Sequence, residues 1–568
     1  MDMAWQERIK RWLEHDRLDE LTKEALTLLK DDEKMAEDAF YQDLTFGTGG
    51  MRGEIGPGTN RMNVYTVRKA SQGIADYIID NGEEAKARGV VIAYDSRRMS
   101  PEFAEEAART FAANGIHTYL YNGPRTTPQL SFSVRYLNAF MGVVITASHN
   151  PPEYNGYKVY ADDGAQLNLE DADRVISFVG KVEDELTIEN EQFSPDLLVR
   201  IDEKLDKVYI DHALTVQEHS SAPIKAVFTP LHGASGATVK RLLDEAGYRD
   251  ITYVKEQMRP DGEFPTVKSP NPEEGSAFEI AMTYGEEIGA DLLIAVDPDG
   301  DRVGLAVWTG SHYELLTGNQ TGAILIEYLL SQKQAKGTLP ENGRVFKTIV
   351  TSEFGRVIAE AYGADCEDVL TGFKFIGEKL KHNDENPKFD FLFGYEESYG
   401  YLICDFARDK DAVQSTLLVI EAAAYYKSQG KSLHDVLVEL YGRYGWYRES
   451  LVSITKKGVD GAREISALLE GLRKNPLQAI AGIPVVSIED YETQNRIFVD
   501  LGTNEKIELP QSNVLKYFLK DGSWVCVRPS GTEPKVKYYF GVTAETEQES
   551  DEKLEFIKES FVNELNNR

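Results

Sequence analysis

Short apolar runs alternate with helical patterns over the first three quarters of the chain. Each run is four to seven residues long and ends in a polar loop, as buried strands of a parallel sheet do. These runs lie at residues 90–94, 117–121, 141–145, 226–230, 291–296, 344–350 and 389–393. Residues 101–114 and 415–427 instead place apolar side chains at helical spacing. The alternation predicts βαβ units, and because it starts three times we expect three similar α/β domains in series.

The pattern changes after about residue 445. Alternating segments such as 496–500 and 524–527, followed by a helical pattern over 552–566, predict a smaller α+β domain. The segment from Trp5 to about Phe40 has helical spacing and indicates helices that serve packing. No Pro/Ser-rich linker marks the boundaries. We place the four domains at residues 1–210, 211–318, 319–443 and 444–568.

Composition narrows the class of protein. The chain has 568 residues, more than one core usually supports, and 42% hydrophobic with 27% charged residues is typical of a soluble globular protein. The formal net charge of −32 disfavours nucleic acid and anionic membranes as partners. Three widely spaced cysteines and the absence of an apolar leader or spanning segment favour the cytoplasm.

The strand that ends at Ile145 delivers Ser148 to the open edge of the first predicted sheet. The sequence there is Thr-Ala-Ser-His-Asn-Pro. The prolines and the Asn155-Gly156 pair predict a tight loop that returns Lys158 towards the serine. Ser148, His149 and Lys158 would then lie together, which makes Ser148 the best candidate nucleophile. The alternative is a polar turn that only caps the strand.

A loop with three carboxylates follows the strand at 291–296. Asp297, Asp299 and Asp301 alternate along it, so that one cation can meet all three. A site that offers a few protein oxygen ligands suits Mg²⁺. An EF-hand is excluded because Arg302 and Trp308 replace its glycine and its last glutamate. An acidic surface turn is the alternative, but clustered carboxylates at the end of an apolar strand repel one another unless a cation is present.

Two further loops are weaker signals on their own. Residues 46–53 are rich in glycine and include Thr48 and Arg52, so the backbone can approach an anion; a flexible linker explains them equally well. Glu396 and Ser398 follow the strand at 389–393 and offer acceptors for sugar hydroxyls, although ordinary surface charge is the usual reading of such a loop.

A fourth loop groups Arg528, Ser530, Gly531 and Thr532, and we interpret it as a phosphate cradle. A Pro-Gly hairpin turn would explain its prolines and glycine but not the arginine with two hydroxyls. The stretch 371–377 misses an ATP-binding Walker A motif because Glu378 stands in place of the lysine. It reads instead as a further substrate contact.

Together these loops resemble those of the α-D-phosphohexomutase family. The Ser148 motif is similar to its phosphoserine loop, the Asp trio to its metal loop, Glu396-Glu397-Ser398 to its sugar loop, and the stretch from Arg528 to Thr532 to its phosphate loop. The four matches come in the family's order and span nearly the whole chain. The resemblance implies three similar mixed α/β domains and a smaller C-terminal α+β domain around a central cleft in which the loops meet.

The resemblance also implies a phosphoryl-transfer cycle. Ser148 would carry a phosphoryl group, pass it to a hexose phosphate and take back the other phosphate, with glucose 1,6-bisphosphate as intermediate and activator. Mg²⁺ would be bound by Ser148, Asp297, Asp299 and Asp301. The expected catalytic residues are Ser148, His149, Lys158, Lys410 and Arg52. The expected substrate contacts are Thr48, Arg302, Thr371, Gly372, Lys374, Glu396, Ser398, Arg528, Ser530, Gly531 and Thr532.

One departure concerns proton transfer. Some members of the family have a histidine shortly after the sugar-loop serine, whereas Tyr399 and Gly400 stand there in this chain. The role then falls to Lys410, which aligns with a lysine beside the sugar in other members. Arg97 is either an additional contact of the phosphoserine loop or a structural ion pair with Asp95.

The Thr-Gly-Phe-Lys-Phe stretch and the chain length are most similar to the branch with phosphoglucomutase and phosphopentomutase, which implies interconversion of glucose 1-phosphate and glucose 6-phosphate. A phosphomannomutase or phosphopentomutase would use the same loops, because epimers differ by one or two hydroxyl contacts. A catalytically inactive sugar-phosphate sensor and a phosphatase are further alternatives. Small sugar phosphates are the expected partners of a monomer or small homo-oligomer.

Overall fold

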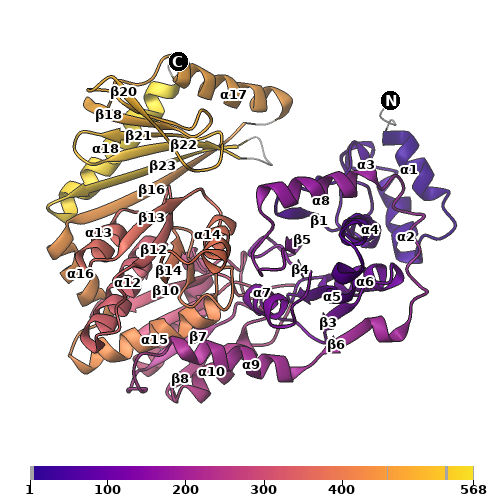
Figure 1. The fold of residues 1–568 in the computed structure, drawn as a ribbon, viewed down its shortest axis with the longest axis horizontal. Coiled ribbons are helices and arrows are strands. Elements are labelled where there is room, and N and C mark those ends of the chain that lie inside the picture. Colours follow the sequence, from indigo (N-terminus) through magenta and orange to yellow (C-terminus); the bar gives the residue numbers. More distant parts are fainter. Residues whose placement is uncertain (1–4, 457, 531–534, 567–568) are drawn as a thin grey trace. The chain divides into compact units, whose positions relative to one another are not determined.

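The computed structural model describes residues 5–456, 458–530 and 535–566, and Figure 1 traces its elements along the chain. The chain forms two compact units. The first contains residues 1–321 and 373–433, and the second contains residues 322–372 and 434–568. The units do not follow chain order, because residues 322–433 are divided between them.

Three short helices precede the first sheet: α1 (Trp5–Leu13), α2 (Glu20–Leu29) and α3 (Glu33–Phe40). The buried Trp12 ring packs edge-on against Phe40 and Tyr65, with centroids 5.5 Å and 5.2 Å away. This apolar cluster confirms the predicted helical segment at the start of the chain.

The first sheet has the strand order β1-β5-β4-β2-β3-β6. The strands from β4 to β6 in this order are parallel, whereas β5 and β1 run antiparallel to their neighbours. Strands β2 and β4 are buried over their whole length, which accounts for their continuous apolar sequence. The bounds are β1 (Gly50–Glu54), β2 (Val90–Tyr94), β3 (Thr118–Tyr121), β4 (Met141–Ile145), β5 (Tyr154–Tyr160) and β6 (Leu198–Ile201).

Helices pack on this sheet and form one core with it. Ile74, Phe103, Phe111 and Val175 belong to the same buried cluster as the side chains of β2 and β4. The helices are α4 (Val64–Asp80), α5 (Glu83–Arg88), α6 (Ser100–Ala113), α7 (Thr127–Tyr136), α8 (Leu169–Lys181) and α9 (Glu203–Ala213), with 3₁₀ turns at Pro195–Leu197 and Leu214–Val216 and the short strand β6 between α8 and α9.

Strands β1 and β5 correct two loop predictions. The glycine-rich stretch is a loop only up to Gly49, because Gly50–Glu54 pairs with β5. Asn155-Gly156 is not a turn but part of β5. The buried Asn155 amide donates to Arg98 O and Ser100 Oγ, both at 2.9 Å. A Cβ on Gly156 would lie 2.5 Å from Thr146 O, so this glycine permits close strand contact and does not form a turn.

The second sheet repeats the pattern in the order β11-β10-β9-β7-β8. Again the central strands are parallel, and the next strand in the chain, β10, runs antiparallel to β9. Its elements are β7 (Ala226–Thr229), α10 (Gly236–Glu245), β8 (Ile251–Tyr253), a 3₁₀ turn (Gly275–Phe278), α11 (Glu279–Ile288), β9 (Leu292–Val296), β10 (Val303–Trp308) and β11 (Tyr313–Leu316).

The first unit ends with the elements of the predicted sugar loop. Strands β14 (Asp390–Glu396) and β15 (Gly400–Leu402) form an antiparallel pair, preceded by α14 (Lys374–Glu385) and followed by α15 (Ala412–Ser428). Because α15 is buried on almost every side, its sequence is mostly apolar and shows little amphipathic pattern.

The second unit contains the rest of the third α/β segment and an antiparallel C-terminal sheet. The parallel pair β12 (Gly343–Thr348) and β13 (Asp365–Val369) lies with α12 (Gly318–Lys336, from Gly322 onward), α13 (Phe354–Ala361) and α16 (Leu433–Tyr444). The C-terminal sheet has the order β16-β23-β22-β21-β18-β19-β20, with β17 beside β18, and its core includes side chains of α17 and α18. The bounds are β16 (Trp446–Thr455), α17 (Gly458–Lys474), β17 (Ala479–Ile480), β18 (Ile483–Asp490), β19 (Asn495–Phe498), β20 (Thr503–Lys506), β21 (Leu515–Leu519), β22 (Trp524–Pro529), β23 (Lys535–Ala544) and α18 (Glu547–Asn566).

Among the described residues, no helix combines the length and the apolar character that crossing a membrane requires.

Candidate active site

Three candidate loops of the first unit occupy the same place in their sheets. Each connects a buried strand to the next strand in the chain, which runs antiparallel to it. The loops lie between β4 and β5, between β9 and β10, and between β14 and β15. The sequence predicted that each loop follows a buried strand, and the structure confirms this.

Ser148 lies in the loop after β4 and is almost fully buried, with 4% of its surface exposed. Its hydroxyl donates to Asp297 Oδ2 at 2.7 Å and lies 3.2 Å from His149 Nδ1. The backbone of Ser148 is in the left-handed region, with φ of 52°, an uncommon conformation for a residue with a side chain. The predicted serine and metal loops therefore meet within the first unit.

The three aspartates come together as the sequence predicts. Their carboxylates are buried, and one oxygen from each lies within 4.8 Å of the other two. Burial and the two neighbouring carboxylates raise the pKa of Asp297 well above its usual range. Burial also acts to raise the pKa of Asp299, but Lys158 and hydrogen bonds lower it below the ordinary value. The cluster therefore holds more negative charge than its surroundings easily stabilise.

The donor set fits a hard cation. Within the described residues, Oδ1 of Asp299 and Oδ1 of Asp301 are buried and accept no hydrogen bond. Buried carboxylate oxygens without a donor are costly unless an ion coordinates them. Gly300 allows the loop to form, because its φ is 71° and a Cβ there would lie 2.5 Å from Thr126 Cγ2. These residues can hold a metal ion.

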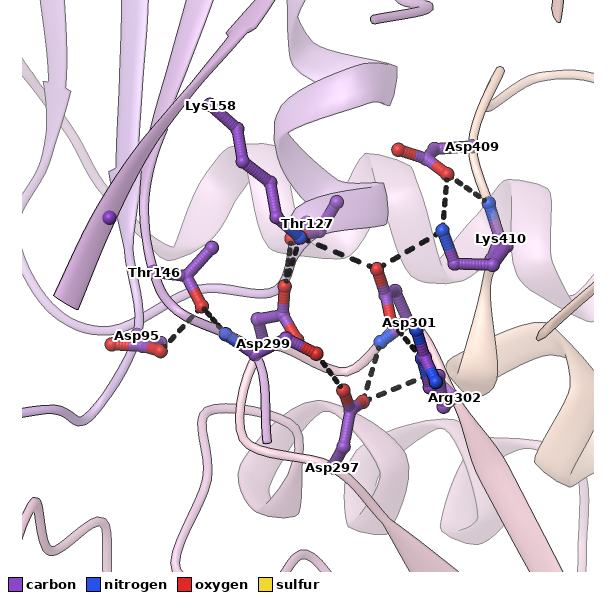
Figure 2. A network of polar contacts seen from close by, with 12 residues as sticks. Asp95, Thr127, Thr146, Lys158, Asp297, Asp299, Asp301, Arg302, Asp409 and Lys410 are labelled. Carbon is purple, nitrogen blue, oxygen red and sulfur yellow. Dashed lines mark hydrogen bonds and ion pairs between the residues drawn. The ribbon is translucent and has the colours of Figure 1, made fainter. Parts of the chain in front are cut away.

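Two lysines approach the aspartates from different elements, as Figure 2 shows. Lys158, on β5, lies 2.7 Å from Asp299 Oδ2 and 3.5 Å from Asp301 Oδ2. Lys410 lies 3.3 Å from Asp301 Oδ2 and 3.1 Å from Asp409 Oδ1. Burial alone would lower the pKa of both ammonium groups, but the carboxylates raise it above the ordinary value. Both lysines are therefore cationic at neutral pH.

Gly400 makes room for Lys410. A Cβ at this position would lie 2.0 Å from Lys410 Cδ, so a side chain there would displace the lysine. The preceding Tyr399 has a positive φ of 64°. The Tyr399-Gly400 pair thus allows the stem of Lys410 to pass close to the backbone of the predicted sugar loop.

Glu396 ends β14 and is buried, with 6% of its surface exposed. Burial raises the pKa of this carboxyl to about 7, against the effect of Lys410 and Arg302, which lower it. Arg302 itself donates to Glu273 Oε1 at 2.6 Å and lies 3.8 Å from Asp301 Oδ1. Ser398 is half-buried in the same turn as Tyr399.

The glycine-rich stretch reaches the serine loop through Arg52, whose Nη1 donates to Asn150 Oδ1 at 3.0 Å. Thr48 is exposed on the loop before β1. Burial and the positive charges of Arg302 and Arg52 lower the pKa of His149 to about 3. His149 is therefore neutral at pH 7 and lies beside Ser148 as a hydrogen-bonding partner, not as a strong base.

The remaining candidates divide between the units. Lys374 lies in the first unit and begins α14, which corrects the prediction of a loop through Gly377; burial lowers its pKa. Thr371 and Gly372 belong to the second unit. So do Arg528, which donates to Tyr539 Oη at 3.5 Å, and Ser530, whose N–H donates to Lys535 O at 2.7 Å. Gly531 and Thr532 lie outside the described residues.

The sequence did not single out two residues that hold this site together. Thr127 donates from its N–H to Asp299 O at 2.8 Å and from its hydroxyl to Asp299 Oδ2 at 2.9 Å. Asp409 accepts from Lys410 and from the buried Tyr160 hydroxyl, at 2.8 Å. For Thr127, the sequence signal was the Thr126-x-x-Gln129 capping box, which marks the start of α7. For Asp409, the acidic residues beside Lys410 were a weaker signal.

Comparisons with known proteins match most of the chain. Models of the phosphoglucomutase/phosphomannomutase family match in order: alpha/beta/alpha domain I over residues 43–185, domain II over 207–310, domain III over 317–444 and the C-terminal domain over 468–559. Three α/β domains followed by a C-terminal domain confirm the predicted fold class.

Similar proteins carry the same kind of name. A phosphoglucomutase of Staphylococcus haemolyticus is 38% identical over 528 residues, which cover 92% of this chain and 94% of that protein. A phosphoglucomutase of Staphylococcus epidermidis is 38% identical over 508 residues, with 88% and 91% coverage. The crystal structure of a phosphomannomutase homologue from Thermus thermophilus superposes with a TM-score of 0.68 at 21% identity, over 92% of this chain and 99% of that one, and supports the fold alone.

Proposed function

Because this chain belongs to the phosphoglucomutase/phosphomannomutase family, we propose that it interconverts glucose 1-phosphate and glucose 6-phosphate through a phosphorylated Ser148. The observation that carries the proposal is the position of the Ser148 hydroxyl, 2.7 Å from Asp297 in a buried cluster of three carboxylates and two lysines. The names of relatives 38% identical to the chain support glucose as the sugar.

The cycle consists of two phosphoryl transfers. In the first, the P–Oγ bond of phosphoserine breaks and Oγ gains a proton, while a P–O bond forms at the C6 hydroxyl of glucose 1-phosphate and that hydroxyl loses its proton. The product is glucose 1,6-bisphosphate. Before the second transfer, the bisphosphate reverses its orientation in the site. Ser148 Oγ then attacks the C1 phosphate, and the freed C1 oxygen gains a proton. The net result is glucose 6-phosphate and a restored phosphoserine.

The protein supplies mainly charge and position, which phosphoryl transfer requires. Lys158, Lys410 and Arg302 place positive charge around the transferred group. Mg²⁺, held by Asp297, Asp299, Asp301 and the Ser148 oxygen, would neutralise charge on that group. Arg52 and Thr48 would support the phosphoserine side.

Proton transfer involves groups on both sides of the reaction. Asp297 accepts the hydrogen bond of the Ser148 hydroxyl and would take its proton when Oγ attacks, while the neutral His149 lies beside the hydroxyl. On the sugar side, Glu396 has a pKa of about 7, which suits exchange of a hydroxyl proton at neutral pH. The cationic Lys410 would donate a proton to the leaving oxygen.

The rest of the substrate would contact the remaining candidates. We assign the sugar hydroxyls to Glu396, Ser398 and Lys374 of the first unit. The substrate contacts of Thr371, Gly372, Arg528, Ser530, Gly531 and Thr532 stay predictions from the sequence. We place the enzyme in the cytoplasm, as a monomer or small homo-oligomer activated by glucose 1,6-bisphosphate.

The test compares wild type with Ser148→Ala on three substrates, each with its matching bisphosphate: glucose 1-phosphate, mannose 1-phosphate and ribose 1-phosphate. We expect wild type to prefer glucose 1-phosphate and to carry a phosphoryl group on Ser148 that exchanges with substrate, measured by mass spectrometry. Ser148→Ala should lose at least ~10³-fold in kcat, because the covalent carrier is gone. Ser311→Ala, at an exposed serine, should match wild type.

Each part of the proposal has its own contrary result. A preference for mannose or ribose phosphate would overturn the substrate assignment. Turnover by Ser148→Ala close to that of wild type would overturn the phosphoserine mechanism. Binding of sugar phosphate without turnover or exchange would indicate a sensor, and steady release of inorganic phosphate would indicate a phosphatase.

A further inference from the structure

The backbone of Ser148 is held in a conformation that its side chain disfavours. A φ of 52° places this residue in the left-handed region, which non-glycine residues occupy only when their surroundings impose it. The conformation directs the hydroxyl to Asp297, 2.7 Å away. The neighbours that impose it lie on both sides of the serine.

Arg97 holds the carbonyl side. Its guanidinium donates to the carbonyl of Ser148 from both Nε, at 3.2 Å, and Nη2. It also donates to Asn150 O, to Pro151 O at 2.9 Å and to Tyr154 O at 3.1 Å. A guanidinium has five N–H donors in a fixed plane, and here these five contacts fix four carbonyls of one loop.

Thr146 holds the amide side. The N–H of Ser148 donates to Thr146 Oγ1 at 2.8 Å, and that hydroxyl donates to Asp95 Oδ2 at 2.7 Å. Figure 2 shows this link from Asp95 to Thr146. Asp95 also accepts from the N–H of Arg97 at 2.9 Å and lies 3.4 Å from its Nε. Both peptide groups of Ser148 are therefore anchored, directly or through one residue, to the buried pair Asp95 and Arg97.

A segment that follows β8 closes over this pair. The ring of the buried Phe264 lies 5.1 Å from the centre of the Arg97 guanidinium. Gly262 packs so closely that a Cβ there would lie 2.5 Å from Arg98 N and 2.8 Å from Arg97 C. The side chain of Arg97 has no exposed surface, so it cannot contact a substrate in solution and acts through the loop.

We infer that Arg97, anchored by Asp95, is a positioning residue that holds Ser148 in the left-handed conformation required for phosphoryl transfer. This inference rests on the proposed role of Ser148. It answers the question that the sequence left open, because Arg97 forms the ion pair with Asp95 and contacts the phosphoserine loop at once. A lysine at position 97 would keep the charge but offer three donors at a single point, and could not reach four carbonyls.

The test is the variant Arg97→Lys. Misplacement of a reacting group by ~1 Å costs about 100-fold in rate, so we expect kcat to fall by about that factor and KM for glucose 1-phosphate to stay within about 3-fold. The rate at which glucose 1,6-bisphosphate phosphorylates Ser148, followed by mass spectrometry, should fall by the same factor as kcat. Guanidinium ion in millimolar amounts should restore part of the activity of Arg97→Ala and none to Ser148→Ala.

Arg98→Lys is the matched control. Arg98 adjoins Arg97 and also reaches the covering segment, through Glu263, but its side chain is exposed and its guanidinium pairs with that glutamate. It should retain wild-type kcat. Phe264→Leu removes the ring over the guanidinium and leaves every hydrogen bond of Arg97 in place. It tests the inference if the Arg97 variants do not fold, with an expected loss in kcat of about 3- to 10-fold at unchanged KM.

The inference would be overturned if Ser148 of the Arg97→Lys variant were phosphorylated at the wild-type rate. A rise in KM of this variant at unchanged kcat would overturn it as well. If Arg97→Lys does not fold, an unchanged kcat in Phe264→Leu would overturn the inference. Failure of wild type itself to carry phosphate on Ser148 would instead overturn the proposed function, so the two failures are distinguishable.

Discussion

Glu396 shows at the scale of one residue how burial sets chemistry. Its pKa of about 7 is raised from an ordinary value of 4.5, first by burial and then by the nearby carboxylates, while Lys410 and Arg302 oppose the shift. The carboxyl therefore changes charge near the pH at which it would exchange a proton with a sugar hydroxyl. The same shift affects stability.

We expect Glu396→Gln to weaken the pH dependence of stability between pH 5 and pH 8. Because the folded pKa of Glu396 is raised, its contribution to stability is full below pH 4.5 and is lost as pH rises through 7. Wild type should therefore lose on the order of 2–3 kcal/mol more than Glu396→Gln over this range. Urea unfolding at the two pH values measures the difference. Glu20→Gln, at an exposed glutamate, should behave as wild type, and equal slopes for all three proteins would contradict the prediction.

At the scale of elements, the hairpin of β9 and β10 concentrates charge in its loop. Asp297, Asp299 and Asp301 are buried at the end of an apolar strand, and α7 fixes Asp299 through Thr127. Burial and the adjacent carboxylates raise the pKa of Asp297, so that without a cation a proton stabilises the loop in its place. Proton and cation should therefore compete.

We expect Mg²⁺ to raise the melting temperature of chelator-treated protein, and to raise it more at pH 8 than at pH 5. An ion at 100 times its Kd adds about 2.7 kcal/mol to stability, which corresponds to roughly 2 °C for a chain of 568 residues. Scanning calorimetry measures the shift. Asp299→Asn should abolish most of it, whereas Asp211→Asn, at an exposed aspartate on α9, should not. No shift in wild type at either pH would refute the cation site.

At the scale of the whole molecule, a buried ionic cluster joins distant parts of the chain within the second unit. Lys347 on β12 lies 2.9 Å from Glu353 and 2.8 Å from Asp368. Lys516 on β21 donates to Ile349 O at 2.7 Å and lies 3.9 Å from Glu353. The cluster thus connects the β12–α13 segment with the C-terminal sheet, which explains why residues 322–372 group with that sheet.

The two buried lysines should differ in their effect on stability. Burial lowers the pKa of both ammonium groups. At Lys347 the carboxylates of Asp368 and Glu353 outweigh burial and raise the pKa. At Lys516 the positive charge of Lys347 lowers the pKa further. Lys347→Met leaves buried carboxylates short of a cation and should cost about 3–5 kcal/mol. Lys516→Met should cost at least about 2 kcal/mol less, since it also removes a poorly stabilised charge. Urea unfolding compares them, and equal losses would contradict the argument.

The sequence was sufficient where chemistry follows a buried strand. The apolar run at 141–145 is β4 at the same residues. The meeting of the Asp trio with Ser148 was implied by the resemblance alone, because the two loops belong to different sheets and no local pattern brings them together. Local propensity failed at Asn155-Gly156, where side-chain hydrogen bonds and close strand packing override a turn signal. For Arg97 the sequence left two roles open, and for Asp409 it predicted none, because their partners come from segments that only the folded chain brings together.

The repeated hairpin has a consequence for how this enzyme can evolve. The loops that hold Ser148, the three aspartates and Glu396 each connect two adjacent antiparallel strands. Such a loop can change in length and sequence without changing the strand order of its sheet. If the loop between β14 and β15 contacts the sugar, as proposed, mutations there can alter the choice of sugar while the hairpins that hold Ser148 and the three aspartates stay unchanged.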